Sequence, residues 1–360
     1  MLEVPLVLDA VNAVAAYLRP FGSVESVANL ARQLPAGLAS CVGFECRLGE
    51  RPAAIDLPIE INSSPAGRSA LTRLAMRTDL DSHVQQRPIS KQLRDFCAEW
   101  NDRTSPLHDA GLVWLEFDVP AGEQYPRPVP GLLFVEFSPT EEPWSATTGL
   151  PTRIMLGRLV ERMVRVVKGS SVPPILSMLV ESDGAGFAGM RPCVLGLPIA
   201  RPGDSVRVCL RVPPDHIRDG LEASGWRLTS SARRHFDSLL ATVGPVCGRI
   251  VVDVDIGRDL SPAIGLEVGF PRRVGPLVHA GWPDLLTCIV ALGLCTADKR
   301  DALLAFPGEP SLTAAADTAR VRRQINHIKL TVVDGQAIEA KAYLAATFVG
   351  APAPARTAPL

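Results

Sequence analysis

The sequence predicts an α/β fold in which five helix-flanked β-hairpin repeats form a closed antiparallel β-barrel of ten strands, with the helices outside. Three observations predict it. Five pairs of β-type runs follow one another along the 360 residues, and most pairs are joined by a short link rich in Gly, Pro or Asp. Amphipathic helical patterns lie between the pairs. Most of the runs alternate between an apolar and a polar face, which is the period of a half-buried antiparallel sheet.

The N-terminal segment, residues 1–39, is expected to form two helices that pack on the barrel. Apolar residues recur at helical spacing in residues 4–19 and again in residues 24–33. The opening carries Glu3 and Asp9 and has no basic leader, so it is not typical of a signal peptide.

The five strand pairs then form one domain, residues 40–349. An Arg-Pro-Gly-Asp link predicts the third hairpin turn and an Asp-Gly link the fifth. The pairs are expected at 40–48 with 54–61, 111–119 with 131–138, 193–200 with 205–212, 248–257 with 263–270, and 325–335 with 339–349. Helices are expected at 67–80, 89–100, 151–168, 214–223, 230–241, 282–294, 297–305 and 312–323. The Ala- and Pro-rich residues 350–360 are expected to be a disordered tail.

The two faces of the strands differ in chemistry. In residues 112–119 the apolar face is Val113, Leu115, Phe117 and Val119, and the polar face is Trp114, Glu116 and Asp118. In residues 325–332 the same alternation assigns Asn326, Ile328, Leu330 and Val332 to the apolar face, and Ile325, His327, Lys329 and Thr331 to the other. The amphipathic helices must bury their apolar stripes against the apolar strand faces.

The polar strand faces are then left on the far side of the sheet. They either face solvent in an open two-layer α+β protein or line the inside of a closed ring. Ten strands favour closure, because a large twisted sheet curls and closure removes both exposed edges. A barrel of about ten strands also has room for a ligand in its lumen.

Composition limits the compartment and the partners. The formal net charge of −1 gives no general field for nucleic acid or for an anionic membrane surface, and no apolar run approaches the roughly 20 residues that span a bilayer. Eight cysteines are spread without a Cys-x-x-Cys motif or a Cys/His cluster, which is typical of reduced core thiols. We therefore expect a soluble cytoplasmic protein without nucleic-acid or membrane partners.

Five helix-flanked hairpins around a solvated centre resemble the ABBA-type (PT-barrel) aromatic prenyltransferases, over about residues 40–349. The most specific local likeness is Lys341-Ala342-Tyr343, which looks like the Lys-x-Tyr element that holds the prenyl diphosphate in the indole-modifying members. The resemblance implies transfer of an allylic prenyl group from its diphosphate to an aromatic or peptide acceptor inside the lumen, in specialised metabolism. Its small-molecule partners would be that prenyl diphosphate and that acceptor.

The resemblance also assigns roles to residues on the polar strand faces. Basic groups hold the leaving diphosphate, aromatic rings shield the carbocation, and a carboxylate orients or deprotonates the acceptor. The substrate-binding candidates are Arg47, Trp114, Arg207, Arg211, Lys329, Lys341 and Tyr343. The catalytic candidates are Glu45, Glu116, Glu136 and His327, whose imidazole is a plausible proton-transfer group beside Lys329.

Paired carboxylates on single strand faces suggest a metal. Asp253 and Asp255 lie about 7 Å apart by strand rise, and Glu267 follows in the partner strand. These three residues are the candidate ligands of a Mg²⁺ ion, and no organic cofactor is indicated. The same acids could instead pair with Arg47, Arg249, Arg207 or Lys329 in a cross-strand salt-bridge network.

Two other functions stay open. Seven carboxylates on the polar faces would repel a diphosphate unless Mg²⁺ or basic residues compensate. The chain could therefore be a non-prenylating accessory or binding protein of a peptide natural product pathway that uses the same chamber. If the sheet does not close, it would be an interaction protein without a chamber.

One glycine-rich segment was tested as a phosphate motif. Residues 184–189 fit Gly-x-Gly-x-x-Gly, and a strand at 175–181 is arguable, but no helix start follows. We interpret the segment as a flexible loop that could cap the mouth of the chamber.

Overall fold

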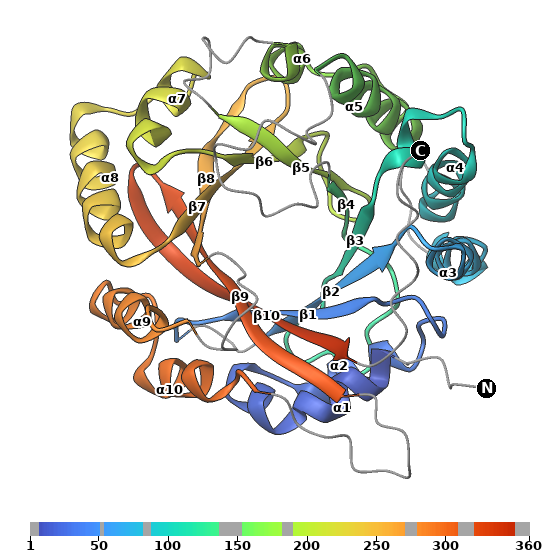
Figure 1. Ribbon diagram of the computed structural model, residues 1–360, viewed down its shortest axis with the longest axis horizontal. Helices are drawn as coiled ribbons and strands as arrows, with labels where there is room; N and C mark the ends of the chain where they lie inside the picture. The colour runs from blue at the N-terminus through green and yellow to red at the C-terminus, as the bar shows by residue number, and fades with distance from the viewer. Residues whose placement is uncertain are drawn as a thin grey trace.

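The structure is a computed structural model, and it describes residues 7–50, 54–81, 88–136, 153–181, 190–270, 279–308 and 320–349. Ten strands close into a barrel in the order β1-β10-β9-β8-β7-β6-β5-β4-β3-β2, and helices surround it (Figure 1). Each strand pairs antiparallel with both of its neighbours. The predicted closed barrel is confirmed, and the open sheet is wrong.

The strands form the five predicted hairpins. Their bounds are β1 Cys41–Arg47, β2 Ile55–Asn62, β3 Leu112–Phe117, β4 Leu132–Glu136, β5 Arg191–Pro198, β6 Val206–Arg211, β7 Arg249–Ile256, β8 Leu260–Gly269, β9 Arg320–Val333 and β10 Gln336–Val349. Two residues, Asp334 at φ 49° and Gly335 at φ 76°, make the β9–β10 turn. A two-residue turn with both central φ angles positive is the one that Asp-Gly favours.

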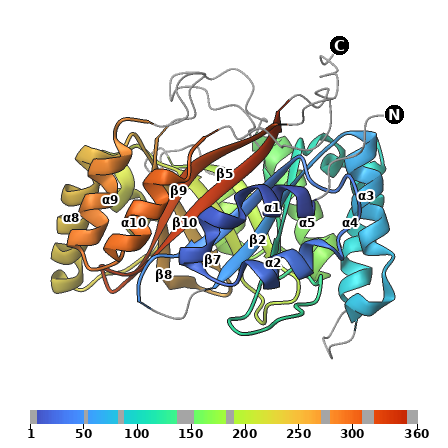
Figure 2. The same ribbon diagram turned by 90° about the horizontal axis from the view of Figure 1, so that it is seen from below.

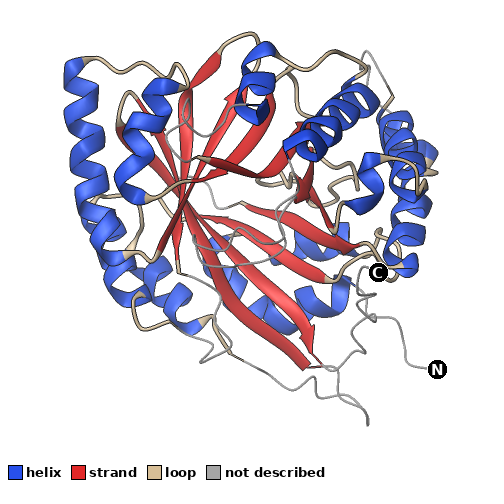
Figure 3. Ribbon diagram, turned by 45° about the horizontal axis from the view of Figure 1, so that its top comes forward, coloured by secondary structure: helices blue, strands red, loops and turns tan. Residues whose placement is uncertain are grey.

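The helices lie between the hairpins and outside the sheet (Figure 3). Their bounds are α1 Val7–Leu18, α2 Val24–Ala31, α3 Pro65–Ala75, α4 Ile89–Asn101, α5 Arg153–Lys168, α6 Pro174–Glu181, α7 Ile217–Ala223, α8 Ser230–Val243, α9 Trp282–Ala291 and α10 Ala297–Ala305. Figure 2 shows α1 and α2 across the outer face of the sheet, where α1 contacts β10 and α2 contacts β2. Among the described residues, no helix is long and apolar enough to cross a membrane.

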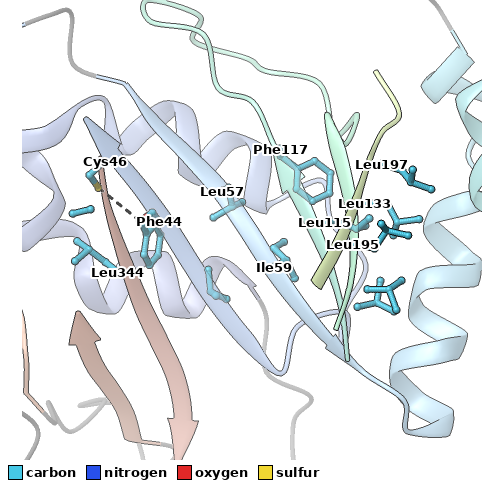
Figure 4. Packing of buried hydrophobic residues seen from close by; sticks show 14 of the residues in the cluster. Phe44, Cys46, Leu57, Ile59, Leu115, Phe117, Leu133, Leu195, Leu197 and Leu344 are labelled. Atoms are coloured by element: carbon cyan, nitrogen blue, oxygen red, sulfur yellow. Dashed lines mark hydrogen bonds between the residues drawn. The ribbon is translucent and has the colours of Figure 1, made fainter. Parts of the chain in front are cut away.

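The core fills the layer between the sheet and the helices. Phe44, Leu57, Leu115, Phe117 and Leu195 point outward from strands β1, β2, β3 and β5 into this layer (Figure 4), and each is fully buried. Burial of one such side chain stabilises the fold by about 1.5–3 kcal/mol. Because the outward positions are apolar, the alternating positions between them carry the polar side chains into the lumen.

One predicted helix is partly wrong. Residues 312–323 were expected to be helical, but residues 320–323 begin strand β9, and residues 312–319 lie outside the described part. Val321 and Arg323 are buried on the outward face, and the Arg323 guanidinium lies 3.6 Å from the centre of the Tyr17 ring. Packing against α1 therefore favours a strand at residues 320–323 over the helix that was predicted there.

The predicted face of two residues in β9 is also wrong. A β-bulge separates the register pairs Tyr343–His327 and Leu344–Ile325, so that Asn326 is the extra residue. Ile325 joins the hydrophobic core, whereas Asn326 lines a cavity in the lumen. An extra residue reverses the alternation on one side of a bulge, which strict two-residue counting misses.

Three further predictions concern residues 175–181, residues 184–189 and the tail at 350–360. The arguable strand at 175–181 is wrong, because these residues belong to helix α6. The Gly-x-Gly-x-x-Gly segment at 184–189 and the tail at 350–360 lie outside the described residues.

Candidate functional site

The barrel lumen holds two chambers that share a set of residues. The larger chamber has a volume of about 570 Å³. It lies at the end of the barrel that carries the hairpin links, beside Ala54, Ala121 and Arg201. The smaller chamber has a volume of about 220 Å³ and lies toward the opposite ends of the strands. Five residues line both chambers, and we call them the belt: Glu116, Arg207, Asp253, Lys329 and Tyr343.

Every site residue predicted from the sequence lines one of these chambers. Besides the belt, the larger chamber receives Glu45, Arg47, Asp255 and Lys341. The smaller chamber receives Trp114, Glu136, Arg211, Glu267 and His327. The prediction that the polar strand faces point into one shared interior therefore holds for all of them.

Lys341, Glu45 and Tyr343 form one hydrogen-bonded group on β1 and β10. The Lys341 ammonium donates to Glu45 Oε1 at 2.6 Å, and the Tyr343 hydroxyl donates to Glu45 Oε2. Burial alone would raise the pKa of Glu45, but the charge and hydrogen bond of Lys341 lower it to about 2. Burial and the Glu45 charge raise the pKa of Tyr343 well above its usual value, so Tyr343 keeps its proton.

Two further ion pairs cross the belt. Arg207 makes a bidentate contact with Asp255, with N–O distances of 2.8 and 2.9 Å, and Lys329 donates to Asp253 Oδ2. Burial would raise the pKa of Asp255, but its hydrogen bonds from Arg207 lower it. The pKa of Asp253 is raised by burial and by the nearby charge of Glu267. Two acids two residues apart in β7 therefore have opposite tendencies to hold a proton.

Glycines make room for two of these side chains. A Cβ at Gly265 would stand 2.6 Å from Lys329 Cε, and one at Gly196 would stand 2.4 Å from Phe134 Cε1. Non-bonded carbon atoms do not approach each other this closely. A side chain at Gly265 would therefore displace Lys329, and one at Gly196 would displace Phe134.

Three residues of the larger chamber were missed by the sequence argument: Arg201, Asp56 and Glu339. Arg201 lies just after β5, and its guanidinium pairs with both Glu116 and Asp118. Asp56 pairs with Arg47 at 3.4 Å and accepts a hydrogen bond from the Val119 backbone at 2.8 Å. Burial and the Glu45 charge raise the pKa of Asp56 to about 7.

The smaller chamber combines an apolar wall with a second charged row. Trp114 and Phe134 stand opposite each other in the β3–β4 register and supply aromatic surface. The His327 ring stacks on Tyr343 with centroids 4.3 Å apart, and its Nε2 lies 3.6 Å from Glu267 Oε1. The chamber thus presents aromatic faces within reach of titratable groups.

The larger chamber carries more acid than base. Its described lining includes seven carboxylates (Glu45, Asp56, Glu116, Asp118, Asp253, Asp255 and Glu339) and five basic groups (Arg47, Arg201, Arg207, Lys329 and Lys341). Each of these five basic groups lies within 4.0 Å of a carboxylate. Two of the expected pairs, Arg207–Asp255 and Lys329–Asp253, are present, whereas Glu116 and Asp118 pair with Arg201, which was not predicted.

The three predicted metal ligands are not brought together as a set. Asp255 faces the larger chamber in its pair with Arg207, whereas Glu267 faces the smaller one. Asp253 and Glu267 do converge, with Cys209 as the third member of the group. The smaller chamber therefore holds a different donor set from the one predicted.

Comparison with solved structures identifies the fold. The chain is similar to 6-dimethylallyltryptophan synthase from Micromonospora olivasterospora, solved in complex with DMASPP and Trp, with a TM-score of 0.57, 13% identity, and coverage of 95% of this chain and 97% of that one. It is similar to the prenyltransferase PriB in its apo form, with a TM-score of 0.57, 12% identity, and coverage of 95% and 96%. AnaPT from Neosartorya fischeri gives a TM-score of 0.51 at 13% identity, with coverage of 96% and 95%.

These likenesses span nearly the whole of each chain and confirm the predicted PT-barrel fold. No family model matches the sequence, and no curated protein matches it. At 12–13% identity the likeness shows the fold alone, so the chemistry of the lumen must be argued from its own residues.

Proposed function

We propose that the protein is a prenyltransferase-like transferase that moves an allylic prenyl group from its diphosphate to an aromatic or peptide acceptor in the barrel lumen. One observation carries the proposal. A belt with Arg207, Lys329 and Tyr343 lies between a large charged chamber and a smaller chamber with an aromatic wall. Cationic groups and aromatic surface therefore lie next to each other in the lumen, which supports binding of an allylic diphosphate there.

The donor would lie with its diphosphate in the larger chamber. Arg207 and Lys329 belong to the belt, and Lys341 donates to Glu45, which also accepts from the belt residue Tyr343. Charge-assisted hydrogen bonds from these three basic groups would stabilise the leaving diphosphate. The C–O bond of the donor breaks, and the diphosphate leaves with the electron pair. The allylic cation then lies near the aromatic faces of Tyr343 and Trp114, which attract it electrostatically.

The acceptor would lie in the smaller chamber. Its carbon or heteroatom forms the new bond to the allylic carbon and gives up a proton to a carboxylate. Glu116 suits this role better than Glu45, because burial raises the pKa of Glu116 while Lys341 lowers that of Glu45. Glu116 also lines both chambers.

The acid excess of the larger chamber adds a requirement. A diphosphate adds further negative charge to a chamber with seven carboxylates and five basic groups, and its attraction to each base competes with a carboxylate already paired there. We therefore include Mg²⁺ in the proposal, as the counter-charge that accompanies the diphosphate.

The test is turnover. Purified protein is given dimethylallyl, geranyl or farnesyl diphosphate with tryptophan or a Trp-containing peptide, with Mg²⁺ or with EDTA, and released pyrophosphate and prenylated product are measured. We expect both products with Mg²⁺, and a loss of more than about 100-fold in Lys329→Ala. Arg165→Ala, at an exposed helical ion pair with Glu161, is the matched control and should keep full activity. No product with any donor would reject the proposal.

A second candidate follows from the charge of the larger chamber. Because the described lining of the larger chamber has seven carboxylates and five basic groups, its excess negative charge would attract a cationic group. The protein would then be a binding or accessory protein that holds an amine or a basic peptide side chain without chemistry. Calorimetric titration with a basic peptide or a diamine, compared with an N-acetylated peptide, tests it: only the cationic ligand should bind.

A further inference from the structure

A compact donor cluster lies in the smaller chamber, on three adjacent strands. The Cys209 sulfur and one carboxylate oxygen each of Asp253 and Glu267 all lie within 4.8 Å of one another. Cys209 and Asp253 are direct register partners of β6 and β7, and Glu267 comes from β8. Cys209 and Asp253 are buried, and Glu267 is half-buried. The sheet itself therefore sets the spacing of this cluster.

The donor atoms have capacity left for a cation. Asp253 Oδ2 is occupied by Lys329, but Asp253 Oδ1 is buried and has no hydrogen-bond partner among the described residues. Asp253 as a whole is only 3% exposed. A buried carboxylate oxygen without a partner costs free energy, and a bound cation would remove that cost.

The charges of the cluster also favour a divalent cation. Once a metal has displaced the thiol proton, Cys209 and the carboxylates of Asp253 and Glu267 carry three negative charges. Lys329, paired with Asp253, supplies one positive charge, so these four groups together carry a net charge of −2. A divalent ion brings the group to neutrality, which is the condition under which charges are tolerated in a buried site.

We propose that Cys209, Asp253 and Glu267 form a binding site for a divalent transition metal of the zinc type. A thiolate ligand selects Zn²⁺, Co²⁺ or Fe²⁺ over Mg²⁺, which takes oxygen ligands. His327 Nε2 lies 3.6 Å from Glu267 Oε1, beside one of the three donors and outside the group that lies within 4.8 Å. The site lies in the smaller chamber and shares the belt residue Asp253, but metal binding to it can be measured without prenyl transfer.

The geometry requires only a small contraction. Around a tetrahedral metal with bonds of about 2.0–2.3 Å, ligand atoms stand roughly 3.3–3.5 Å apart. The three donor atoms lie within 4.8 Å of one another, so side-chain rotations that move each atom by about 1 Å would complete the site. A thiolate is the form of cysteine that binds a metal, so the metal displaces the Cys209 thiol proton on binding.

The test uses Co²⁺ as a spectroscopic probe of the whole protein. Titration of metal-free protein with Co²⁺ should give one equivalent of binding with a near-ultraviolet thiolate-to-cobalt band, which Zn²⁺ abolishes and millimolar Mg²⁺ does not. Cys209→Ser should remove the band and weaken Zn²⁺ binding by more than about 100-fold, and Glu267→Gln should weaken binding while the band persists. Circular dichroism confirms that each variant is folded.

Cys193 provides the matched control. It lines the same chamber and donates to the Cys209 carbonyl at 3.2 Å, but it is outside the donor cluster. Cys193→Ser should keep the band and the affinity. The absence of a cobalt band in the wild-type protein at pH 8, or its persistence in Cys209→Ser, would overturn the proposal. Neither result depends on whether prenyl transfer is observed.

Discussion

Asp56 illustrates how the lumen controls the ionisation of a single side chain. Its carboxyl lies opposite Glu45 in the β1–β2 register, and it is 4% exposed. Burial and the Glu45 charge raise its pKa to about 7, although Arg47 and the Val119 amide both stabilise the charged form. The charged form of Asp56 therefore destabilises the folded state at neutral pH.

We expect Asp56→Asn to stabilise the protein increasingly as the pH rises. The pKa of Asp56 is higher in the folded than in the unfolded chain, so its penalty is absent below about pH 4, grows by about 1.4 kcal/mol per unit, and is complete above about pH 7. Asparagine keeps an oxygen for the Val119 amide. Urea unfolding at pH 5 and pH 8 measures the difference.

The exposed Asp301 is the control for this prediction. Its side chain is 64% exposed, and Asp301→Asn should change stability by less than about 0.5 kcal/mol at either pH. An equal effect of Asp56→Asn at pH 5 and pH 8 would show that Asp56 is not the titrating group.

The sequence predicts which residues face the lumen better than it predicts their partners. Strand alternation suffices to find Glu45, Lys329 and Lys341, because their neighbours in the chain are apolar. Arg201 was missed because it lies in the link after β5 and reaches back to Glu116. The Cys209–Asp253–Glu267 cluster depends on the register across the three strands β6, β7 and β8, which the pattern of one strand does not encode.

At the scale of elements, the hairpins were predictable because turn chemistry and alternation agree. The β9–β10 turn is the clearest case, since Asp334-Gly335 joins two alternating strands. Two tertiary effects were not predictable from local pattern. Arg323 is held in a strand by the Tyr17 ring, and the bulge at Asn326 changes which residue faces the lumen.

The Asp-Gly turn between β9 and β10 also packs closely against helix α8. Gly335 has φ 76°, and a Cβ there would stand 1.9 Å from the Ala232 carbonyl oxygen of α8. We expect Gly335→Ala to destabilise the fold by more than about 3 kcal/mol, because both the backbone conformation and the contact with α8 must change. Chemical denaturation measures the loss.

Gly203 separates these two causes. It has φ 114°, and a Cβ there would meet nothing within 4 Å. Gly203→Ala should therefore cost only the backbone term, about 1–2 kcal/mol. If the two variants lose equal stability, the contact between the hairpin turn and α8 contributes nothing.

At the scale of the whole molecule, the lumen concentrates charge inside a protein whose formal net charge is only −1. The larger chamber has two more carboxylates than basic groups among its described lining residues. We expect inorganic pyrophosphate alone to leave the melting temperature unchanged and pyrophosphate with Mg²⁺ to raise it by a few degrees, in a thermal shift assay. Stabilisation by pyrophosphate in EDTA would contradict this assignment of charge.

The closure of the barrel has a consequence for how the chain folds during synthesis. β1 completes its pairing only with β10, and their register couples Glu45 to Tyr343, 298 residues later. A ribosome-bound chain that still lacks β10 exposes the free edges of β1 and β9 and opens its charged interior to water. Such long-range pairing is slow and leaves the nascent protein prone to association, so chaperone protection matters most until the final strand emerges.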